Sequence, residues 1–491
     1  MPQKTIVLFQ QDLRLSDNPA LIYAAKRGEV IPVYVWDNIV GSQGLGGASK
    51  WWLHHSLLAL QASLKERGVQ LILRQGDTLT VISQLLKECA ADGVYWNRCY
   101  EPNAIEKGKT LKTALEAQKI EAKSFKTGLL FEPWEIANKQ GDFFKVFTPF
   151  WRHCLTQAVS IGEPYEVPEF LPSTHSNKCD DLLEWKLLPT HPDWSGGLRN
   201  LWHPGEKFAH QRLHSFLDNC LGAYAEKRDI PSDAGTSYLS PHLHWGEISP
   251  RQLYNATRYH EALTGNSRAA EKFLSELGWR EFSYYLLYHV PNLPSMPFNL
   301  KFKDFPWVSD DGALRAWQRG ETGYPLVDAG MRELWETGYM HNRVRMIVAS
   351  FLTKHLQVDW KHGAAWFWDT LVDADLANNS ASWQWVAGCG ADASPYYRIF
   401  NPILQGQRFD PAGKYVRRWI PELSKLPDTY IHCPWEAGEE ILRHAGVSLG
   451  KNYPGPIVNH AAAREAALHA YKMHKSDATS PPSINGLKDV V

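Results

Sequence analysis

Residues 366–402 hold the densest group of side chains that could do chemistry in this chain of 491 residues. Two acids, two amides and two tryptophans lie close together there: Asp373, Asp375, Asn378, Asn379, Trp383 and Trp385. Carboxylates and amides among aromatic rings are costly to bury unless something pairs with them. A flavin-like ligand, planar with polar edges, would pair with these groups and stack on the rings. A capped helix end followed by a packed tryptophan-rich loop explains the same pattern, so both interpretations stay open.

A second group consists of hydroxyl side chains in residues 235–252, GTSYLSPHLHWGEISPRQ. Thr236, Ser237 and Ser240 fall in one turn before an expected helix. Hydroxyls and backbone N–H groups at a helix N-terminus suit a phosphate. Ordinary N-capping uses the same residue types, and from the residues alone it is the favoured interpretation.

A third group lies in residues 273–282, FLSELGWREF. Glu276, Trp279 and Arg280 are spaced i, i+3 and i+4, which places them on one face of a helix. A Glu–Arg pair on a helix is usually a solvated surface pair. The tryptophan between them favours the lining of a site instead.

Residues 338–351, GYMHNRVRMIVASF, repeat this arrangement. Asn342, Arg345 and Met346 share one helical face, on a helix that is otherwise apolar. Such a face indicates either a lined cavity or a core helix with one buried ion pair.

The composition limits the protein class. The length predicts at least two domains, and 44% apolar residues are typical of a globular protein. The net charge of −1 excludes a polyanion binder as a whole but allows a local basic patch that binds DNA. Seven cysteines without a CxxC pair favour a reducing compartment and no structural metal site. The chain starts directly with an expected strand and has no apolar run of about 20 residues, so we expect no membrane span.

The pattern of apolar residues divides the chain. Residues 1–130 alternate short apolar runs with amphipathic segments, which predicts a Rossmann-like α/β domain with a parallel sheet. No GxGxxG or GxxxxGK[ST] motif accompanies it. Residues 131–200 are rich in Pro and Trp and predict an interdomain connector. Residues 201–475 show the i, i+3, i+4 pattern of an all-α domain. Residues 476–491 are polar and predict a disordered tail.

The motifs together resemble one family. DADLANN, WQW and GADASPYYRIFNP occur in the order found in the photolyase/cryptochrome family, and the similarity extends from FQQDLRLSDNPAL to RRWIPEL. The version here is most similar to the class III branch of cyclobutane pyrimidine dimer photolyases. The resemblance implies an α/β domain that carries an antenna chromophore and an all-α C-terminal domain that binds FAD and DNA.

The resemblance implies a role for each group. FAD is expected to contact residues from four segments: Tyr224, Thr236, Ser237, Tyr238, Leu239, Ser240, Phe273, Glu276, Arg280, Tyr339, Asn342, Arg345, Asp373, Ala374, Asp375 and Asn379. Arg345 is expected to pair with Asp373, and Asn379 to face the flavin. The pyrimidine dimer is expected to meet Glu276, Trp279, Asn342, Met346 and Trp385.

Three further sets follow from the resemblance. An electron-transfer wire is expected through Trp383, Trp360 and Trp307. Phosphates of damaged DNA are expected at Arg228, Arg343, Arg398 and Lys414. The antenna, methenyltetrahydrofolate or alternatively a deazaflavin, is expected near Trp36, Asp37, Lys50, Trp51 and Glu101, although ordinary core packing explains these residues equally well. Gln10 and Gln11 replace an arginine that is usual before the DLRL motif, which weakens this placement.

The function implied is light-driven repair of cyclobutane pyrimidine dimers by electron transfer from reduced FAD to a flipped-out dimer. The enzyme would be a deoxyribodipyrimidine photo-lyase, a cytoplasmic monomer that joins the nucleoid at lesions. A blue-light photoreceptor of the cryptochrome kind, with the same fold and FAD, is the alternative. The short C-terminal tail and the repair-type residues Glu276, Trp279 and Met346 favour repair. A flavin oxidoreductase is disfavoured by the missing glycine motif.

Overall fold

The computed structural model describes residues 3–37, 44–173, 178–393 and 397–477. The chain separates into two compact units, each formed by segments distant in sequence. Unit 1 consists of Met1–Pro294, Glu333–Met340 and Ala365–Ala381, and unit 2 of Ser295–Arg332, His341–Ala364 and Ser382–Val491.

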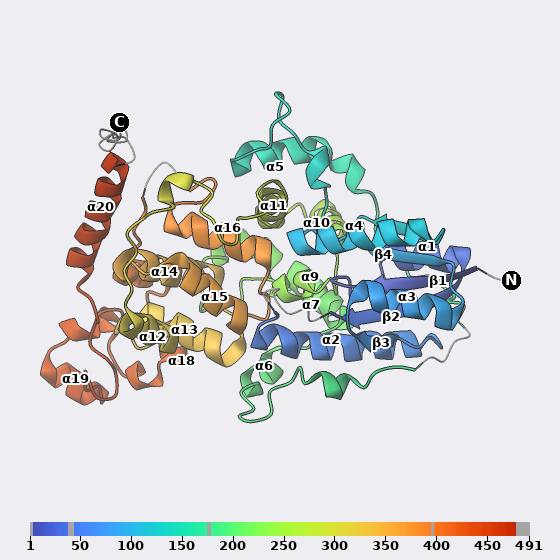
Figure 1. The fold of residues 1–491 in the computed structure, drawn as a ribbon. Coiled ribbons are helices and arrows are strands. Elements are labelled where there is room, and N and C mark those ends of the chain that lie inside the picture. Colours follow the sequence, from blue (N-terminus) through green and yellow to red (C-terminus); the bar gives the residue numbers. More distant parts are fainter. Residues whose placement is uncertain (1–2, 38–43, 174–177, 394–396, 478–491) are drawn as a thin grey trace, which may run out of the picture. The chain divides into compact units, whose positions relative to one another are not determined.

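Unit 1 begins with a five-stranded parallel sheet of order β3-β2-β1-β4-β5. The strands are β1 (Gln3–Phe9), β2 (Gly28–Trp36), β3 (Ile72–Gln75), β4 (Gly93–Asn97) and β5 (Glu121–Phe125). The helices that connect them are α1 (Pro19–Arg27), α2 (Gly47–Lys65), α3 (Thr78–Cys89) and α4 (Pro102–Ala117). The predicted Rossmann-like parallel sheet is therefore confirmed, and Figure 1 shows its strands between the connecting helices.

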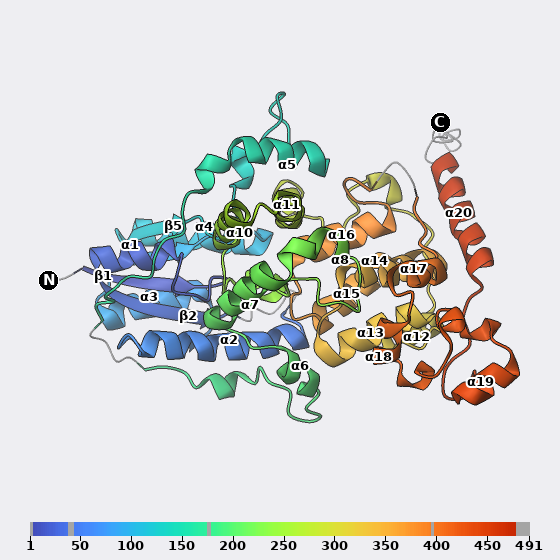
Figure 2. The same ribbon diagram turned by 180° about the vertical axis from the view of Figure 1, so that it is seen from behind.

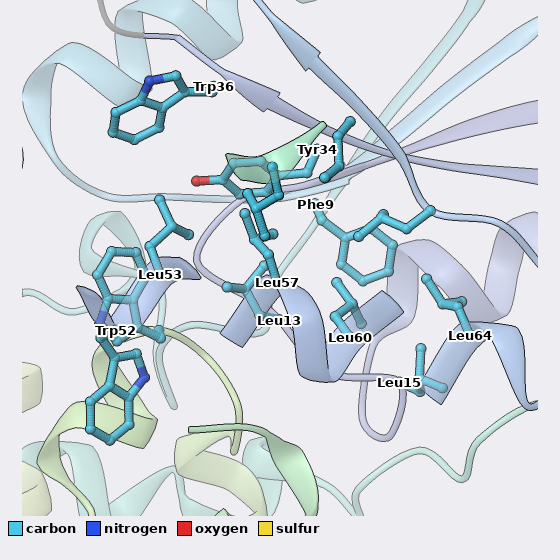
Figure 3. Packing of buried hydrophobic residues seen from close by; sticks show 14 of the residues in the cluster. Phe9, Leu13, Leu15, Tyr34, Trp36, Trp52, Leu53, Leu57, Leu60 and Leu64 are labelled. Atoms are coloured by element: carbon cyan, nitrogen blue, oxygen red, sulfur yellow. The ribbon is translucent and has the colours of Figure 1, made fainter. Parts of the chain in front are cut away.

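Alternate residues of the strands supply two separate cores, because successive side chains point to opposite faces of a sheet. Val7 and Phe9 pack with α1 and α2, whereas Ile6 and Leu8 pack with α3 and α4. Figure 3 shows the first core, where four leucines of α2 (Leu53, Leu57, Leu60 and Leu64) face Phe9, Leu13 and Tyr34. Full burial of a leucine contributes about 1.5–3 kcal/mol, so this face alone fixes α2 on the sheet.

The rest of unit 1 is helical. Its helices are α5 (Phe147–Thr156), α6 (Gly196–Leu201), α7 (Glu206–Asn219), α8 (Tyr224–Lys227), α9 (Ser240–His244), α10 (Pro250–Thr264) and α11 (Ser267–His289). The helices α10 and α11 lie side by side, as both views show (Figures 1 and 2). The connector contains α5, a helix that its weak periodicity did not predict. Gly278 permits α5 to pack on α11, because a Cβ there would lie 2.6 Å from the Trp151 ring.

Unit 2 contains α12 (Asp311–Arg319), α14 (Asn342–Ser350), α17 (Pro402–Phe409), α18 (Lys414–Trp419), α19 (Glu439–Ala445) and α20 (His460–Asp477). A π-helical turn, η6 (Phe351–His355), follows α14 directly. Three helices have residues in both units: α13 (Pro325–Thr337), α15 (Trp360–Thr370) and α16 (Leu376–Ala387). The predicted all-α second part is confirmed. The domain boundaries at residues 130, 200 and 475 stay predictions, and most of the expected tail lies outside the described residues.

None of the helices in the described part of the chain combines the length and the apolar character needed to cross a bilayer.

Glu281 of α11 joins this helix to the start of the connector. Its Oε2 accepts hydrogen bonds from the backbone N–H groups of Leu130 (2.8 Å) and Phe131 (3.3 Å). The neighbouring Arg280 donates to the carbonyl of Gly128 at 2.8 Å. Burial raises the pKa of Glu281 to about 7, although the Arg280 charge and the two backbone hydrogen bonds act in the opposite direction. The folded protein therefore retains a proton on Glu281 that the unfolded chain loses near its ordinary pKa of 4.5.

We expect the free energy of unfolding to fall by about 3 kcal/mol through Glu281 as the pH rises from 4.5 to 7, and to level off above. Urea unfolding at several pH values should show a weaker pH dependence in Glu281→Gln. Glu271, an exposed acid of the same helix that pairs with Arg258, provides the control, because Glu271→Gln should keep the wild-type slope. Equal slopes in all three proteins would contradict the assignment.

The close packing around Gly246 leads to a second testable prediction about stability. Its φ is +64°, and a Cβ there would lie 2.0 Å from the backbone oxygen of Gln11. We expect Gly246→Ala to lower the free energy of unfolding by about 2–5 kcal/mol, from backbone strain and overpacking together.

Gly265, with φ +73° and open space around a Cβ, isolates the strain alone. Gly265→Ala should therefore cost only about 1–2 kcal/mol. Chemical denaturation measures both variants, and equal losses would contradict the close approach.

Candidate functional site

The loop at residues 235–239 combines an unpaired hydroxyl with a strained backbone. The buried Oγ1 of Thr236 makes no hydrogen bond to any residue that the structure describes. Tyr238 adopts φ +53°, which costs a side-chain-bearing residue about 1–3 kcal/mol. The loop needs glycine at position 235, because a Cβ there would lie 2.8 Å from the Lys227 carbonyl oxygen. Buried polar atoms normally find a partner, so the loop has room for one more acceptor or donor, such as a phosphate.

Ser237, Leu239 and Ser240 complete this loop. The Ser237 hydroxyl accepts a hydrogen bond from the Leu239 N–H at 3.4 Å, and Leu239 is buried. Ser240 begins α9. The structure therefore brings the predicted hydroxyl residues together in one turn.

Glu276 and Arg228 form an ion pair next to this loop. The Arg228 guanidinium donates to Glu276 Oε1, and its carbon lies 5.5 Å from the centre of the Tyr224 ring. Lys272, one turn earlier on α11, lies 3.8 Å from the same carboxylate oxygen. The Glu276 side chain keeps 29% of its surface exposed. The two cations therefore pair with the carboxylate and leave part of it accessible.

Trp279 lies on the same face of α11 and is half-buried. The Phe147 ring of α5 stacks on it, with centroids 3.8 Å apart and planes 11° apart. Sequence reasoning did not find Phe147, because the residue lies in the connector. Tyr224 and Phe273 are buried beside this group, with their rings perpendicular at 5.5 Å.

Asp375 is buried at the start of α16, and both of its oxygens are occupied. Oδ1 accepts from the backbone and side-chain nitrogens of Asn378 at 2.8 and 2.7 Å. Oδ2 accepts from the Tyr284 hydroxyl and lies 3.2 Å from Nδ1 of His244. Burial opposes the charged form, but these hydrogen bonds and the Arg280 charge outweigh it and hold the pKa of Asp375 below its usual value. Asp375 therefore positions the residues that follow it.

Further predicted flavin contacts of unit 1 are neighbours of Asp375 in sequence or contact the 235–239 loop. Asp373 and Ala374 are buried directly before Asp375, and Asn379 is half-buried directly after Asn378. Tyr339 is buried and its ring lies 4.8 Å from that of Tyr238.

Unit 2 contributes the face of α14 that sequence reasoning singled out. His341 caps this helix, its Nδ1 accepting from the N–H of Arg343 at 3.2 Å. Asn342 is exposed and Arg345 and Met346 are half-buried, whereas Val344 and Ile347 point into the core. These three residues lie on the less buried face of α14, and their expected contacts with flavin and dimer stay predictions. The expected pairing of Arg345 with Asp373 joins two units and stays a prediction.

The three tryptophans of the predicted wire all lie in unit 2. Trp383 and Trp360 are each 2% exposed, and Trp307 is half-buried. The Trp383 ring lies against α15, because a Cβ on Gly363 would lie 2.1 Å from this ring. Gly363 is one helical turn after Trp360. Trp317, which sequence reasoning missed, is fully buried with its ring 6.1 Å from that of Trp383.

Predicted DNA contacts of unit 2 lie on α14, on α18 and near the end of α16. Arg343 has its guanidinium carbon 4.5 Å from the Phe409 ring, and its NH1 lies 3.8 Å from Met346 Sδ. Lys414 is exposed at the start of α18, and Arg398 is exposed 5.9 Å from the Trp385 ring.

The predicted antenna residues are mostly part of the core of unit 1. Trp36 and Trp51 are 7% and 1% exposed; Trp36 stacks on Trp185 and Trp51 contacts His55. Asp37 binds Thr78 and Lys107 through Oδ2, and Lys50 is half-buried on α2.

Glu101 accepts from Gln11 at 3.4 Å, and burial together with the Asp375 charge raises its pKa. The antenna site stays a prediction.

Comparison with known proteins identifies the relatives of this arrangement. Residues 273–473 match the FAD binding domain of DNA photolyase, and residues 5–169 match the DNA photolyase domain. A deoxyribodipyrimidine photo-lyase of Agrobacterium fabrum is 51% identical over 95% of this chain and 97% of that protein. Cryptochrome-1 of Arabidopsis thaliana is 40% identical over 95% of this chain and 69% of that protein. The crystal structure of a class III photolyase from Agrobacterium tumefaciens superposes with a TM-score of 0.93, at 49% identity, and covers 97% of this chain and 98% of that one.

Proposed function

This chain belongs to the DNA photolyase family, and we propose that it repairs cyclobutane pyrimidine dimers in DNA with light. The observation that carries the proposal is the accessible face of α11, where a carboxylate and an indole ring lie one turn apart at Glu276 and Trp279. An enzyme that acts on a base must take it out of the stack and hold it by hydrogen bonds and ring contacts. This face supplies both.

The residues of the 235–239 loop fit the diphosphate of FAD. The Thr236 hydroxyl is buried without a partner among the described residues, and a phosphate oxygen would satisfy it. Asp375 fixes the start of α16 and so holds Asn379 for a flavin edge. Reduced FAD, when bound, supplies the electron that splits the dimer and receives it back. The chain itself binds, orients and excludes water.

Three finer points are proposals of the same kind. A second chromophore, methenyltetrahydrofolate or alternatively a deazaflavin, would bind in unit 1 near Asp37. The buried Asp37 Oδ1, Trp51 Nε1 and Trp185 Nε1 make no hydrogen bonds to the described residues and support this. The wire through Trp383, Trp360 and Trp307 would restore the reduced flavin. The enzyme would act as a cytoplasmic monomer on the nucleoid, with phosphates at Arg343, Arg398 and Lys414.

The first prediction concerns Glu276. The purified protein, loaded with FAD and reduced, should restore thymine absorbance in an oligonucleotide with one thymine dimer under blue light and not in the dark. We expect Glu276→Gln to repair at least about tenfold more slowly at low substrate, because a charge-assisted hydrogen bond contributes about 1.5–3 kcal/mol. Its FAD content, measured by absorbance, should match the wild type.

The matched control is Glu271→Gln, the same change at an exposed position of α11, which should repair like the wild type. Full repair by Glu276→Gln would contradict the site assignment. Bound, photoreducible FAD without repair in the wild type would favour the cryptochrome-type photoreceptor.

The second prediction concerns Arg228, which has donors beyond the one it gives to Glu276. We expect it to contact a DNA phosphate as well, so Arg228→Gln should reduce the slope of log K against log salt concentration by about 1. Fluorescence anisotropy with dimer-containing DNA measures this slope. Arg268→Gln, on the exposed first turn of α11, should leave it unchanged. An unchanged slope in Arg228→Gln would mean that Arg228 acts only on Glu276.

A further inference from the structure

The ring of Tyr397 is enclosed by two residues distant in sequence, all within unit 2. The Tyr471 ring of α20 stacks on it, with centroids 4.4 Å apart and planes 10° apart. The Lys354 Nζ lies 3.2 Å from the Tyr397 ring centre. One ring face cannot accommodate both groups at these distances, so they cover opposite faces. Tyr397 is therefore clamped between α20 and the π-turn η6.

Lys354 extends the clamp to the end of α16. Its side chain is completely buried, and Nζ donates to the backbone oxygen of Ala387 at 2.5 Å. Gly388 follows with φ +90°, and a Cβ there would lie 3.2 Å from the Tyr397 ring and 3.3 Å from Nζ. Burial holds the pKa of Lys354 well below its usual value, and the amine can donate this hydrogen bond with or without its extra proton. Single π-turns inside helices are frequent at functional sites.

The clamped segment carries two residues of the DNA-binding face. Arg398 follows Tyr397 directly, and Trp385 precedes Ala387 on α16. The Arg398 guanidinium lies 5.9 Å from the Trp385 ring, whose Nε1 donates to the Asp392 carbonyl at 3.1 Å. The buried Tyr397 hydroxyl makes no hydrogen bond to the described residues, so ring contacts hold the side chain in place.

Independent contacts hold α20 itself in position. His460 at its start hydrogen-bonds to His355 of η6 at 2.8 Å. The Tyr471 ring also lies 6.2 Å from that of Phe302, with planes 26° apart. The helix can therefore support Tyr397 firmly.

We infer that Tyr471 and Lys354 are positioning residues that hold Arg398, beside Trp385, for damaged DNA, so that α20 supports the DNA-binding surface. This inference rests on the proposed function. A dimer is flipped out only if phosphate contacts on its flanks offset the cost of unstacking, and an arginine offsets that cost best when its backbone is already fixed.

A double-mutant cycle tests the inference in the FAD-loaded protein. Anisotropy measures the Kd for an oligonucleotide with one thymine dimer in the wild type, Tyr471→Leu, Arg398→Gln and the double variant. We expect Tyr471→Leu to weaken binding about threefold to tenfold, the value of one aromatic stack. In the Arg398→Gln background the same change should have little further effect, because Arg398 no longer needs support. Repair at saturating substrate should stay at the wild-type rate.

Two variants separate positioning from general stability. Tyr471→Phe keeps the stacked ring and should bind DNA like the wild type. His469→Ala, at an exposed position of the same helix, should neither weaken binding nor couple to Arg398. If Tyr471→Leu does not load FAD, Lys354→Met removes the other side of the clamp and takes its place in the cycle.

Two outcomes would overturn the inference: wild-type affinity in Tyr471→Leu, or equal losses with and without Arg398. Failure of the proposed function is distinguishable, since the wild type itself would then neither prefer nor split the dimer-containing oligonucleotide.

Discussion

A buried carboxylate persists in its charged form only where protein groups replace all of its water, and Asp375 meets this condition. Its two oxygens receive hydrogen bonds from α9, α11 and the first turn of α16. Removing one partner of a buried charge typically costs about 3–5 kcal/mol, so the three helices are held in one arrangement. Arg280 lies 4.9 Å from the Tyr284 ring and adds its charge to the same point. The accessible residues of α11, Glu276 and Trp279, depend on this fixed geometry.

The sequence predicted the parts of the fold that follow from periodicity. A parallel sheet buries both faces of its inner strands, so these strands appear as apolar runs, and all five strands were predicted between amphipathic helices. The face of α14 with Asn342, Arg345 and Met346 followed from helical spacing and is the less buried one. The site residues needed the family resemblance in addition, because periodicity cannot distinguish a Glu276 that meets a ligand from one in a surface ion pair.

What the sequence did not reveal are contacts between residues far apart in the chain. Phe147 covers Trp279 from a short helix in a proline-rich connector, where no repeating pattern exists. Tyr471 meets Tyr397 across a long sequence separation, and each looks like an ordinary surface tyrosine alone. Trp36 and Trp51 were predicted to line a chromophore site or to pack in the core, and both are buried in the core of unit 1. The neighbouring sequence does not distinguish a tryptophan that lines a binding site from one that packs in a core.

Two departures from ordinary local rules lie beside the residues that the proposed function uses. In the core of unit 1, leucines at helical spacing on α2 face alternating strand residues. A positive φ at Tyr238 and a Thr236 hydroxyl that has no partner among the described residues occur two residues apart in one loop. A π-turn and a fully buried lysine coincide at Lys354. Such features cost stability and persist only where the rest of the structure compensates. Both groups lie next to residues that the proposed function assigns to cofactor or DNA, which fits a cost in stability accepted for binding.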